Sequence, residues 1–253
     1  MLRLILTLLL LAPLAAPPAQ AQTVPPAQAQ SALAAVAANF AGAAEALVAD
    51  YQTRTGYKIT LTTGSTGKLY AQILQGAPFD LFLSADAATP ALLHSQGHGA
   101  PVPYAIGQLV LWIPASTSGD PVALLATPAI RHIAIANPDL APYGVAAREA
   151  LEAMGLWQSL TSKIVMGQNI GQTHALVATG AAEAGFVAAS GLGPEATGLR
   201  WPVPESDHTP IRQDAQVLTR GADNPAVTGF LTYLTTPEAR AIIQRFGYKA
   251  ATP

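Results

Sequence analysis

The chain has 253 residues, a formal net charge of −2 and no cysteine, so it offers no thiol for a disulfide, a thiolate metal site or an N-terminal lipid anchor. Charged residues make up only 11% of the chain, and Lys and Arg form no clustered run. Proteins that bind nucleic acids need a basic face, and this composition therefore argues against that class of partner.

Residues 1–21 have the composition of a signal peptide. Arg3 supplies the positive charge, and the apolar run at 4–16 is shorter than the roughly 20 residues that a membrane-spanning helix needs. Cleavage signals of the Ala-x-Ala type end at Ala21 and Ala29, and residues 22–30 resemble a tether. We therefore expect an exported protein without a lipid anchor.

From residue 31 onward, strand-like and helix-like stretches alternate, which indicates an α/β fold with parallel sheets. Residues 191–210 are rich in Gly and Pro and are expected to be irregular. We expect strands at 31–38, 58–63, 80–84, 108–113, 133–136, 163–166, 184–188 and 215–219. We expect helices at 41–55, 68–75, 90–96, 146–154, 172–179, 225–234 and 237–246.

Small polar residues follow several of the expected strands, at the edge of the sheet where α/β proteins bind ligands. These junctions contain Asn39, Gly-Ser-Thr-Gly at 64–67, Ser-Ala-Asp at 84–86, Pro-Tyr-Gly at 142–144 and Asn-Ile-Gly at 169–171. Hydroxyl groups, amides and the free N–H groups of helix N-termini suit an anion. Any one of these residues could simply cap a helix, so only their repetition predicts an anion site.

Enzyme readings find less support in the sequence. No Gly-x-Ser-x-Gly elbow is present, and Gly97 interrupts the pair formed by His94 and His98, which lacks an acidic third ligand. Asp86 is better explained as a helix cap than as a catalytic group. An exported α/β hydrolase that uses Ser84 or Ser65 with His174 remains the alternative from another class.

The segment at 76–86, Gly-Ala-Pro-Phe-Asp-Leu-Phe-Leu-Ser-Ala-Asp, resembles the periplasmic molybdate-binding proteins, the solute receptors of molybdate ABC importers. The resemblance continues at 64–69, 142–144, 148–151, 204–206 and 246–248, and it covers about residues 31–249. It implies a periplasmic binding protein of type II, not an enzyme. Each of its two lobes would be a mostly parallel sheet flanked by helices, with the ligand in the cleft between them. We expect lobe one at 31–104 and 209–253 and lobe two at 105–208.

The resemblance also implies the residues that bind the ligand. They are Asn39, where the family usually has Ser, then Ser65 and Thr66 in the turn, and the backbone N–H groups of Tyr143 and Ile170. Some members use a Tyr hydroxyl at the position of Ala188, and the Tyr143 hydroxyl is the candidate to replace it.

The ligand implied in this way is molybdate, together with tungstate. The molybdenum or tungsten would be bound only as part of the oxyanion, so no protein side chain is expected to ligate the metal. No cofactor is expected. The implied partner is a membrane-embedded ABC permease, and the receptor is expected to be a monomer. The alternative within the binding class is a receptor for another tetrahedral oxyanion such as sulfate. Phosphate is less favoured, because it carries a proton at neutral pH and needs an acceptor in the site.

Overall fold

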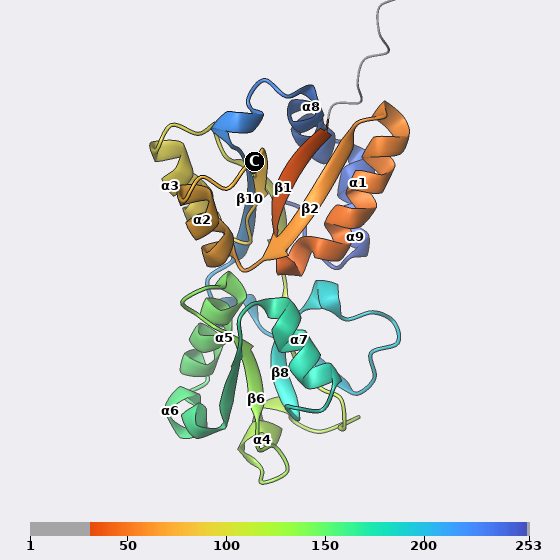
Figure 1. The fold of residues 1–253 in the computed structure, drawn as a ribbon. Helices are drawn as coiled ribbons and strands as arrows, with labels where there is room; N and C mark the ends of the chain where they lie inside the picture. The colour runs from red at the N-terminus through yellow and green to blue at the C-terminus, as the bar shows by residue number, and fades with distance from the viewer. Residues whose placement is uncertain (1–30, 252–253) are drawn as a thin grey trace, which may run out of the picture.

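The computed structural model describes residues 31–251, so the signal peptide and tether predicted at 1–30 lie outside the described residues. Two five-stranded sheets, each flanked by helices, lie one above the other (Figure 1). This confirms the predicted α/β fold with two lobes. Within the described residues, no helix is both long and apolar enough to cross a membrane.

The first sheet has the strand order β2-β1-β3-β10-β4. Strands β1 (Ser31–Ala37), β2 (Lys58–Gly64) and β3 (Leu81–Leu83) pair in parallel, whereas β10 (Ile211–Val217) runs antiparallel to both β3 and β4 (Val102–Gly107). Four of the five strands therefore point the same way. Alternate residues of β1 enter two different apolar clusters, one on each face of the sheet.

Helices cover both faces of this sheet (Figure 1). The cluster on one face includes residues of α1 (Ala41–Thr55), α8 (Pro225–Leu234) and α9 (Pro237–Arg245). The cluster on the other face includes residues of α2 (Thr66–Leu74) and α3 (Ala88–Ser95). Strand β1 is apolar throughout its buried part because helices cover both of its faces. Its alanines are also small, which allows these helices to pack closely against it.

The second sheet repeats this arrangement with the order β7-β6-β8-β5-β9. Strands β7 (Ile164–Gly167), β6 (Ile133–Ala136) and β8 (Ala184–Ala188) are parallel, and β5 (Leu109–Ile113) runs antiparallel to β8 and to β9 (Leu199–Pro202). Residues of α4 (Pro121–Ala126), α5 (Pro142–Ala153) and α6 (Trp157–Leu160) pack on one face, and α7 (Ile170–Ala178) packs on the other.

The chain passes from the first sheet to the second between Gly107 and Leu109 and returns between β9 and β10. Strand β4 stays paired with β10 as far as Gly107, so the first sheet continues beyond residue 104, where we expected the passage. The division of the whole chain into lobes at residues 104 and 208 remains a prediction from the sequence.

Several expected element bounds were wrong. Strand β9 lies inside the segment at 191–210 that we expected to be irregular, and β4 and α4 were not expected at all. The last strand begins at Ile211 instead of residue 215. Helix α5 begins at Pro142, four positions before residue 146, because a proline is well tolerated in the first turn of a helix.

Candidate functional site

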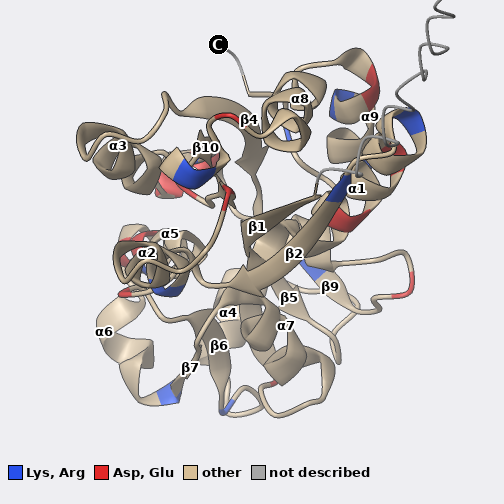
Figure 2. Cartoon of the chain, turned by 45° about the horizontal axis from the view of Figure 1, so that its top comes forward, with Lys and Arg blue, Asp and Glu red and all other residues tan. Residues whose placement is uncertain are grey.

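A small cavity lies between the two sheets, where strands β1, β2, β6 and β7 end. All five residues predicted to bind the ligand line it: Asn39, Ser65, Thr66, Tyr143 and Ile170. The other lining residues are Ala37, Ala38, Gly64, Ala85, Ala141, Pro142 and Asn169. Of the described residues that line the cavity, none carries a charge. Figure 2 shows no charged residue along β1, whose end lies at the cavity.

Four helical N-termini converge on this cavity, two from each lobe. In the first lobe they belong to α2 and to the short helical turn η1 (Ala38–Phe40) that leads into α1, and in the second lobe to α5 and α7. The N–H groups of a first turn have no partner within their helix, and the helix dipole is positive at this end. The cavity therefore favours a negative ligand although no cation lines it.

Ser65 and Thr66 each use the hydroxyl oxygen to hold the backbone in place. Ser65 Oγ accepts from the backbone N–H of Lys68 at 3.4 Å and so caps α2, and Thr66 Oγ1 accepts from the backbone N–H of Ala85 at 3.1 Å. Both residues are buried. Because both hydroxyls accept in these contacts, each keeps its own proton for a further acceptor in the cavity.

Asn39 is buried, and both hydrogens of its side-chain amide have partners within the protein. Its Nδ2 donates to Gln213 Oε1 at 2.8 Å and to Tyr248 Oη at 3.0 Å. The donor that Asn39 still offers to a ligand is its backbone N–H, in the first turn of η1.

In the second lobe, Tyr143 and Ile170 lie in the first turns of α5 and α7. Asn169 caps α7, since its Oδ1 accepts from the backbone N–H of Gln172 at 2.9 Å. The Tyr143 ring is fully buried, and its hydroxyl accepts from Gln213 Nε2 at a long 3.5 Å. Burial, with a contribution from the Tyr248 hydroxyl, raises the pKa of Tyr143 well above its ordinary value, so the hydroxyl keeps its proton.

A buried polar network behind the cavity was missed by the sequence reasoning. Besides its contacts with Asn39 and Tyr143, Gln213 contacts Tyr104. The Tyr104 hydroxyl lies 3.0 Å from Gln213 Oε1 and 2.8 Å from the backbone oxygen of Ser84, so its one proton is shared between these two acceptors. Burial raises the pKa of Tyr104 well above its ordinary value, so the network is neutral. The polar residues at 212–214 and 216, in a strand whose other three residues are apolar, were the available signal.

Two further contacts connect the lobes at the cavity. The backbone N–H of Gly67, one residue into α2 after Thr66, donates to the backbone oxygen of Leu140 at 3.0 Å. On another side, Ser190 Oγ donates to the backbone oxygen of Asn39 at 2.9 Å. The two lobes are thus in direct contact around the cavity.

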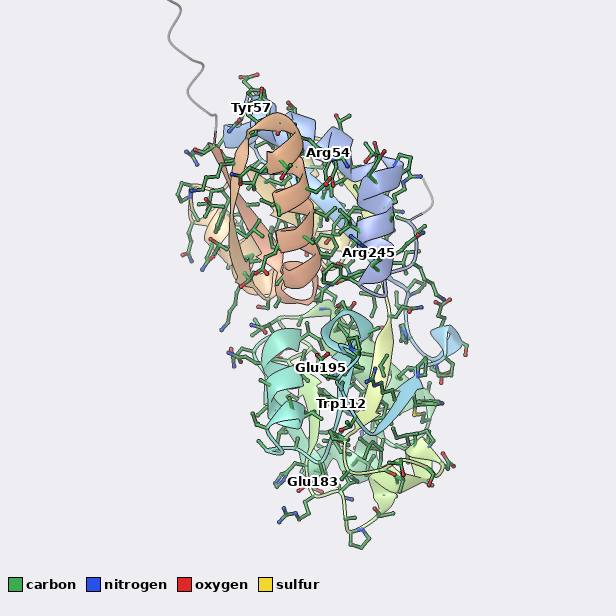
Figure 3. All side chains as sticks on the ribbon, turned by 90° about the vertical axis from the view of Figure 1, so that its right-hand side faces the viewer. Arg54, Tyr57, Trp112, Glu183, Glu195 and Arg245 are labelled. Carbon is green, nitrogen blue, oxygen red and sulfur yellow. The ribbon has the colours of Figure 1, made fainter. Side chains whose placement is uncertain are left out.

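Within the described residues, neither Ser84 nor Ser65 forms a hydrogen bond with His174, the pair that a hydrolase would need. Ser84 Oγ donates to Asp86 Oδ1 at 3.1 Å, and the His174 ring stacks on Trp112 with centroids 5.3 Å apart in the second lobe (Trp112 in Figure 3). Asp86 accepts from the backbone N–H of Thr89 at 2.9 Å, as expected of a capping residue.

The histidines at 94 and 98 hold loops in place. His94 Nδ1 lies 3.1 Å from the backbone oxygen of His98, and His98 Nδ1 accepts from the backbone N–H of Thr219 at 3.0 Å. Among residues 31–251, no cluster of three or more His, Asp or Glu is arranged to hold a metal ion.

Residues 32–249 match the family model of the bacterial extracellular solute-binding proteins. The chain is 44% identical over 223 residues to the molybdate-binding protein ModA of Azotobacter vinelandii, covering 85% of this chain and 88% of the relative. It is 41% identical to ModA of Rhodobacter capsulatus, covering 85% and 87%.

The solved structure of the A. vinelandii periplasmic molybdate-binding protein matches with a TM-score of 0.83 at 37% identity, covering 87% of this chain and all of that one. The sulfate-binding protein SubI of Mycobacterium tuberculosis, at 14% identity and a TM-score of 0.70, shares the fold. The chain therefore belongs to the ModA family of bacterial molybdate-binding proteins, and it is a binding protein and not an enzyme.

Proposed function

We propose that the protein is a periplasmic receptor that binds molybdate, and also tungstate, and delivers the oxyanion to a membrane-embedded ABC permease. The observation that carries the proposal is the convergence of four helical N-termini and the five predicted residues on one uncharged cavity. The names of the relatives support molybdate as the ligand. The protein would act as a monomer, without a cofactor and without ligating the metal directly.

The donors around the cavity fit a tetrahedral dianion. The hydroxyls of Ser65 and Thr66 and the backbone N–H groups of Asn39, Tyr143 and Ile170 come from both lobes and surround the same space. A hydrogen bond to a charged group contributes about 1.5–3 kcal/mol net, so several of them together can offset the desolvation of the anion. No carboxylate among the described residues that line the cavity could accept a proton, which disfavours phosphate.

Closure of the lobes supports the delivery step. Contacts between the lobes, such as the Gly67–Leu140 hydrogen bond, can form only when the lobes are together. A ligand that binds to both walls would favour this closed state over an open one, because it has more donors there. We propose that the permease recognises the closed form.

Calorimetric titration of the purified protein with molybdate, tungstate, sulfate and phosphate tests the proposal. We expect tight binding of molybdate and tungstate and much weaker binding of sulfate and phosphate. Binding of sulfate as tight as that of molybdate would favour the general oxyanion receptor. Turnover of an ester or phosphoester substrate would contradict the assignment as a receptor.

A further inference from the structure

Gln213 connects the two walls of the cavity from behind. It lies on β10, is fully buried, and sits where the register between β10 and β4 shifts. Its Oε1 lies 2.8 Å from Asn39 Nδ2 in the first lobe, and its Nε2 lies 3.5 Å from the Tyr143 hydroxyl in the second. One neutral side chain therefore contacts a cavity-lining residue of each lobe.

The proton of Tyr248 fixes how the Asn39 amide is oriented. Tyr248 Oη lies 2.6 Å from the backbone oxygen of Asn39 and 3.1 Å from Ser190 Oγ. Ser190 directs its own proton to that same backbone oxygen, so the single proton of Tyr248 is used toward one of these two atoms. The Asn39 side-chain atom 3.0 Å from Tyr248 Oη must then be a donor, which is the amide nitrogen.

The orientation of the Gln213 amide follows from that of Asn39. The second hydrogen on Asn39 Nδ2 points to the Gln213 atom at 2.8 Å, which must be the oxygen. The Tyr104 hydroxyl lies 3.0 Å from that oxygen and 2.8 Å from the backbone oxygen of Ser84, and its one proton is shared between these two acceptors. The Gln213 nitrogen is consequently the atom that faces Tyr143. Because an amide nitrogen only donates, the Tyr143 oxygen accepts, and its proton is left for another acceptor.

We propose that Gln213 is a positioning residue that directs the proton of the Tyr143 hydroxyl toward the oxyanion in the cavity. The inference rests on the proposed function, because it requires an anion as the acceptor. In this arrangement the Tyr143 hydroxyl donates to the ligand in place of the Tyr that some family members have at the position of Ala188. The side-chain amide of Asn39 holds Gln213 in its orientation and does not contact the ligand. Within the described residues, no hydrogen bond from the Tyr143 hydroxyl to another protein group competes with this role.

Gly107 makes room for this arrangement. A Cβ at position 107 would lie 2.1 Å from Tyr143 Oη and 2.7 Å from Gln213 Nε2, closer than any real contact. Glycine at this point of β4 therefore lets the hydroxyl and the amide meet where the chain leaves the first sheet.

A double-mutant cycle with molybdate as the titrant tests the proposal. Gln213→Met keeps the approximate volume and removes the amide, and we expect it to weaken binding about tenfold. Tyr143→Phe should weaken binding about ten- to hundredfold. The double variant should bind as Tyr143→Phe does, because Gln213 acts through the hydroxyl that this variant lacks. A merely structural role would instead add the two losses.

Gln216→Met is the matched control. Gln216 is also fully buried on β10, but its Nε2 donates to the backbone oxygens of Gly99 and Val217, and it does not line the cavity. We expect this variant to lose thermal stability without a change in affinity. The thermal midpoint of each variant is measured without ligand, so that a loss of binding is separated from a loss of fold.

Should Gln213→Met fail to fold, Gln213→Glu gives a second test. A protonated Glu can donate to Tyr143 as the amide does, whereas the carboxylate accepts the Tyr143 proton. Affinity should then fall more steeply with rising pH than in the double variant Gln213→Glu with Tyr143→Phe. Any of three results would overturn the inference. They are equal affinity of Gln213→Met and wild type, additive losses in the double-mutant cycle, and equal pH profiles of Gln213→Glu with and without Tyr143→Phe. Failure of the wild type to bind any of the four oxyanions would overturn the proposed function, and the inference with it.

Discussion

The two lobes share one sheet topology, but they support their walls of the cavity in different ways. In each sheet, the two strands at one edge lead into helices that begin at the cavity. These strands are β2 and β1 in the first lobe and β7 and β6 in the second. Behind the first-lobe wall lies a network of buried side chains around Gln213, whereas backbone N–H groups and the cap Asn169 form the second-lobe wall. The network reaches the second-lobe wall only at the Tyr143 hydroxyl, so the backbone donors of that wall depend on the starts of α5 and α7.

The largest effect is expected from a change that displaces the second-lobe backbone. A Cβ at Gly144 would lie 2.2 Å from the backbone oxygen of Ala136, so Gly144→Ala must push the start of α5 away from β6. We expect a loss of about 3 kcal/mol in the free energy of unfolding, measured with urea, and weak binding of molybdate. Val145→Ala, at an exposed neighbouring position, is the control and should change neither quantity appreciably.

A first-lobe hydroxyl should matter to both stability and binding. Thr66→Ala removes a donor to the anion and leaves the backbone N–H of Ala85 without its acceptor. We expect affinity to fall by roughly 1.5–3 kcal/mol, or about ten- to hundredfold, and unfolding free energy to fall by about 1 kcal/mol. Calorimetry and urea titration measure the two quantities, with the exposed Thr63→Ala as control. A loss of stability with intact binding would mean that Thr66 only supports the loop.

The second-lobe wall can be tested at its cap. Asn169→Ala leaves α7 uncapped at the point where Ile170 faces the cavity, and should cost about 1 kcal/mol of stability and a few-fold in affinity. Asn224 caps α8 in the same way, with Oδ1 3.0 Å from the backbone N–H of Ala226, but it does not line the cavity. Asn224→Ala should therefore cost similar stability and leave affinity unchanged. Equal affinities for the two variants would show that the second-lobe wall does not depend on this cap.

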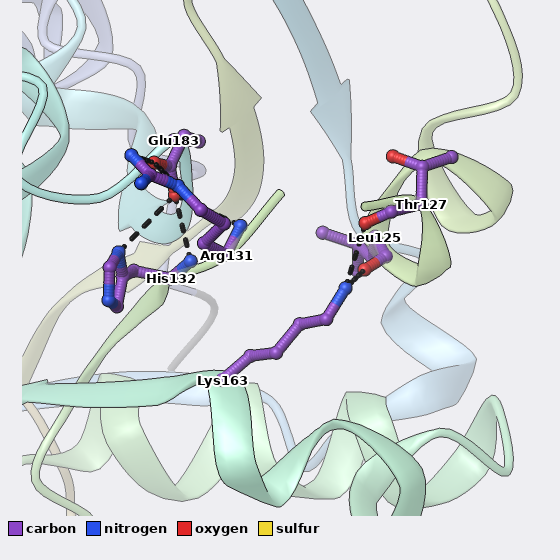
Figure 4. A network of polar contacts seen from close by, with 6 residues as sticks. All are labelled: Leu125, Thr127, Arg131, His132, Lys163 and Glu183. Atoms are coloured by element: carbon purple, nitrogen blue, oxygen red, sulfur yellow. Dashed lines mark hydrogen bonds and ion pairs between the residues drawn. The ribbon is translucent and has the colours of Figure 1, made fainter. Parts of the chain in front are cut away.

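The smallest effect concerns acid stability at the far end of the second lobe (Figure 4). Backbone N–H donation from His132, together with the Arg131 side chain, lowers the pKa of Glu183 from 4.5 to about 2. A lowered folded-state pKa stabilises the fold above about pH 4.5 and ceases to do so as the pH falls toward 2. Glu183→Gln should lower unfolding free energy at pH 7 by about 1 kcal/mol or less, and the difference from wild type should shrink between pH 4.5 and pH 2. Molybdate affinity at pH 7 should not change, since Glu183 is remote from the cavity.

Local signals in the sequence were enough for much of the fold. Helices α1 and α8 were predicted with their observed bounds, and Gly56 ends α1 as expected. Helix α5 was predicted too short because residues 142–144 were assigned to the junction before the helix, although Pro142 occupies its first turn. Strand β9 was missed because its partner β5 lies far away in the chain, and only that pairing makes the segment a strand.

The cavity residues could be predicted because they lie in local sequence motifs, whereas the network behind them joins residues far apart in the chain. Each predicted binding residue lies in a short motif at the end of a strand, which the sequence shows directly. The hydrogen bonds of Asn39, in contrast, join residues 174 and 209 positions apart in the chain. Nothing local at Gln213 or Tyr248 specifies these partners, so only the assembled sheet reveals them.

The placement of β10 between β3 and β4 has a consequence for how the chain is made. Until residues 211–217 have left the ribosome, β3 and β4 have no strand between them, and the first sheet is divided into two pieces. The second lobe is continuous in the chain and can assemble earlier. A nascent chain therefore keeps its first lobe unfinished until synthesis is nearly complete.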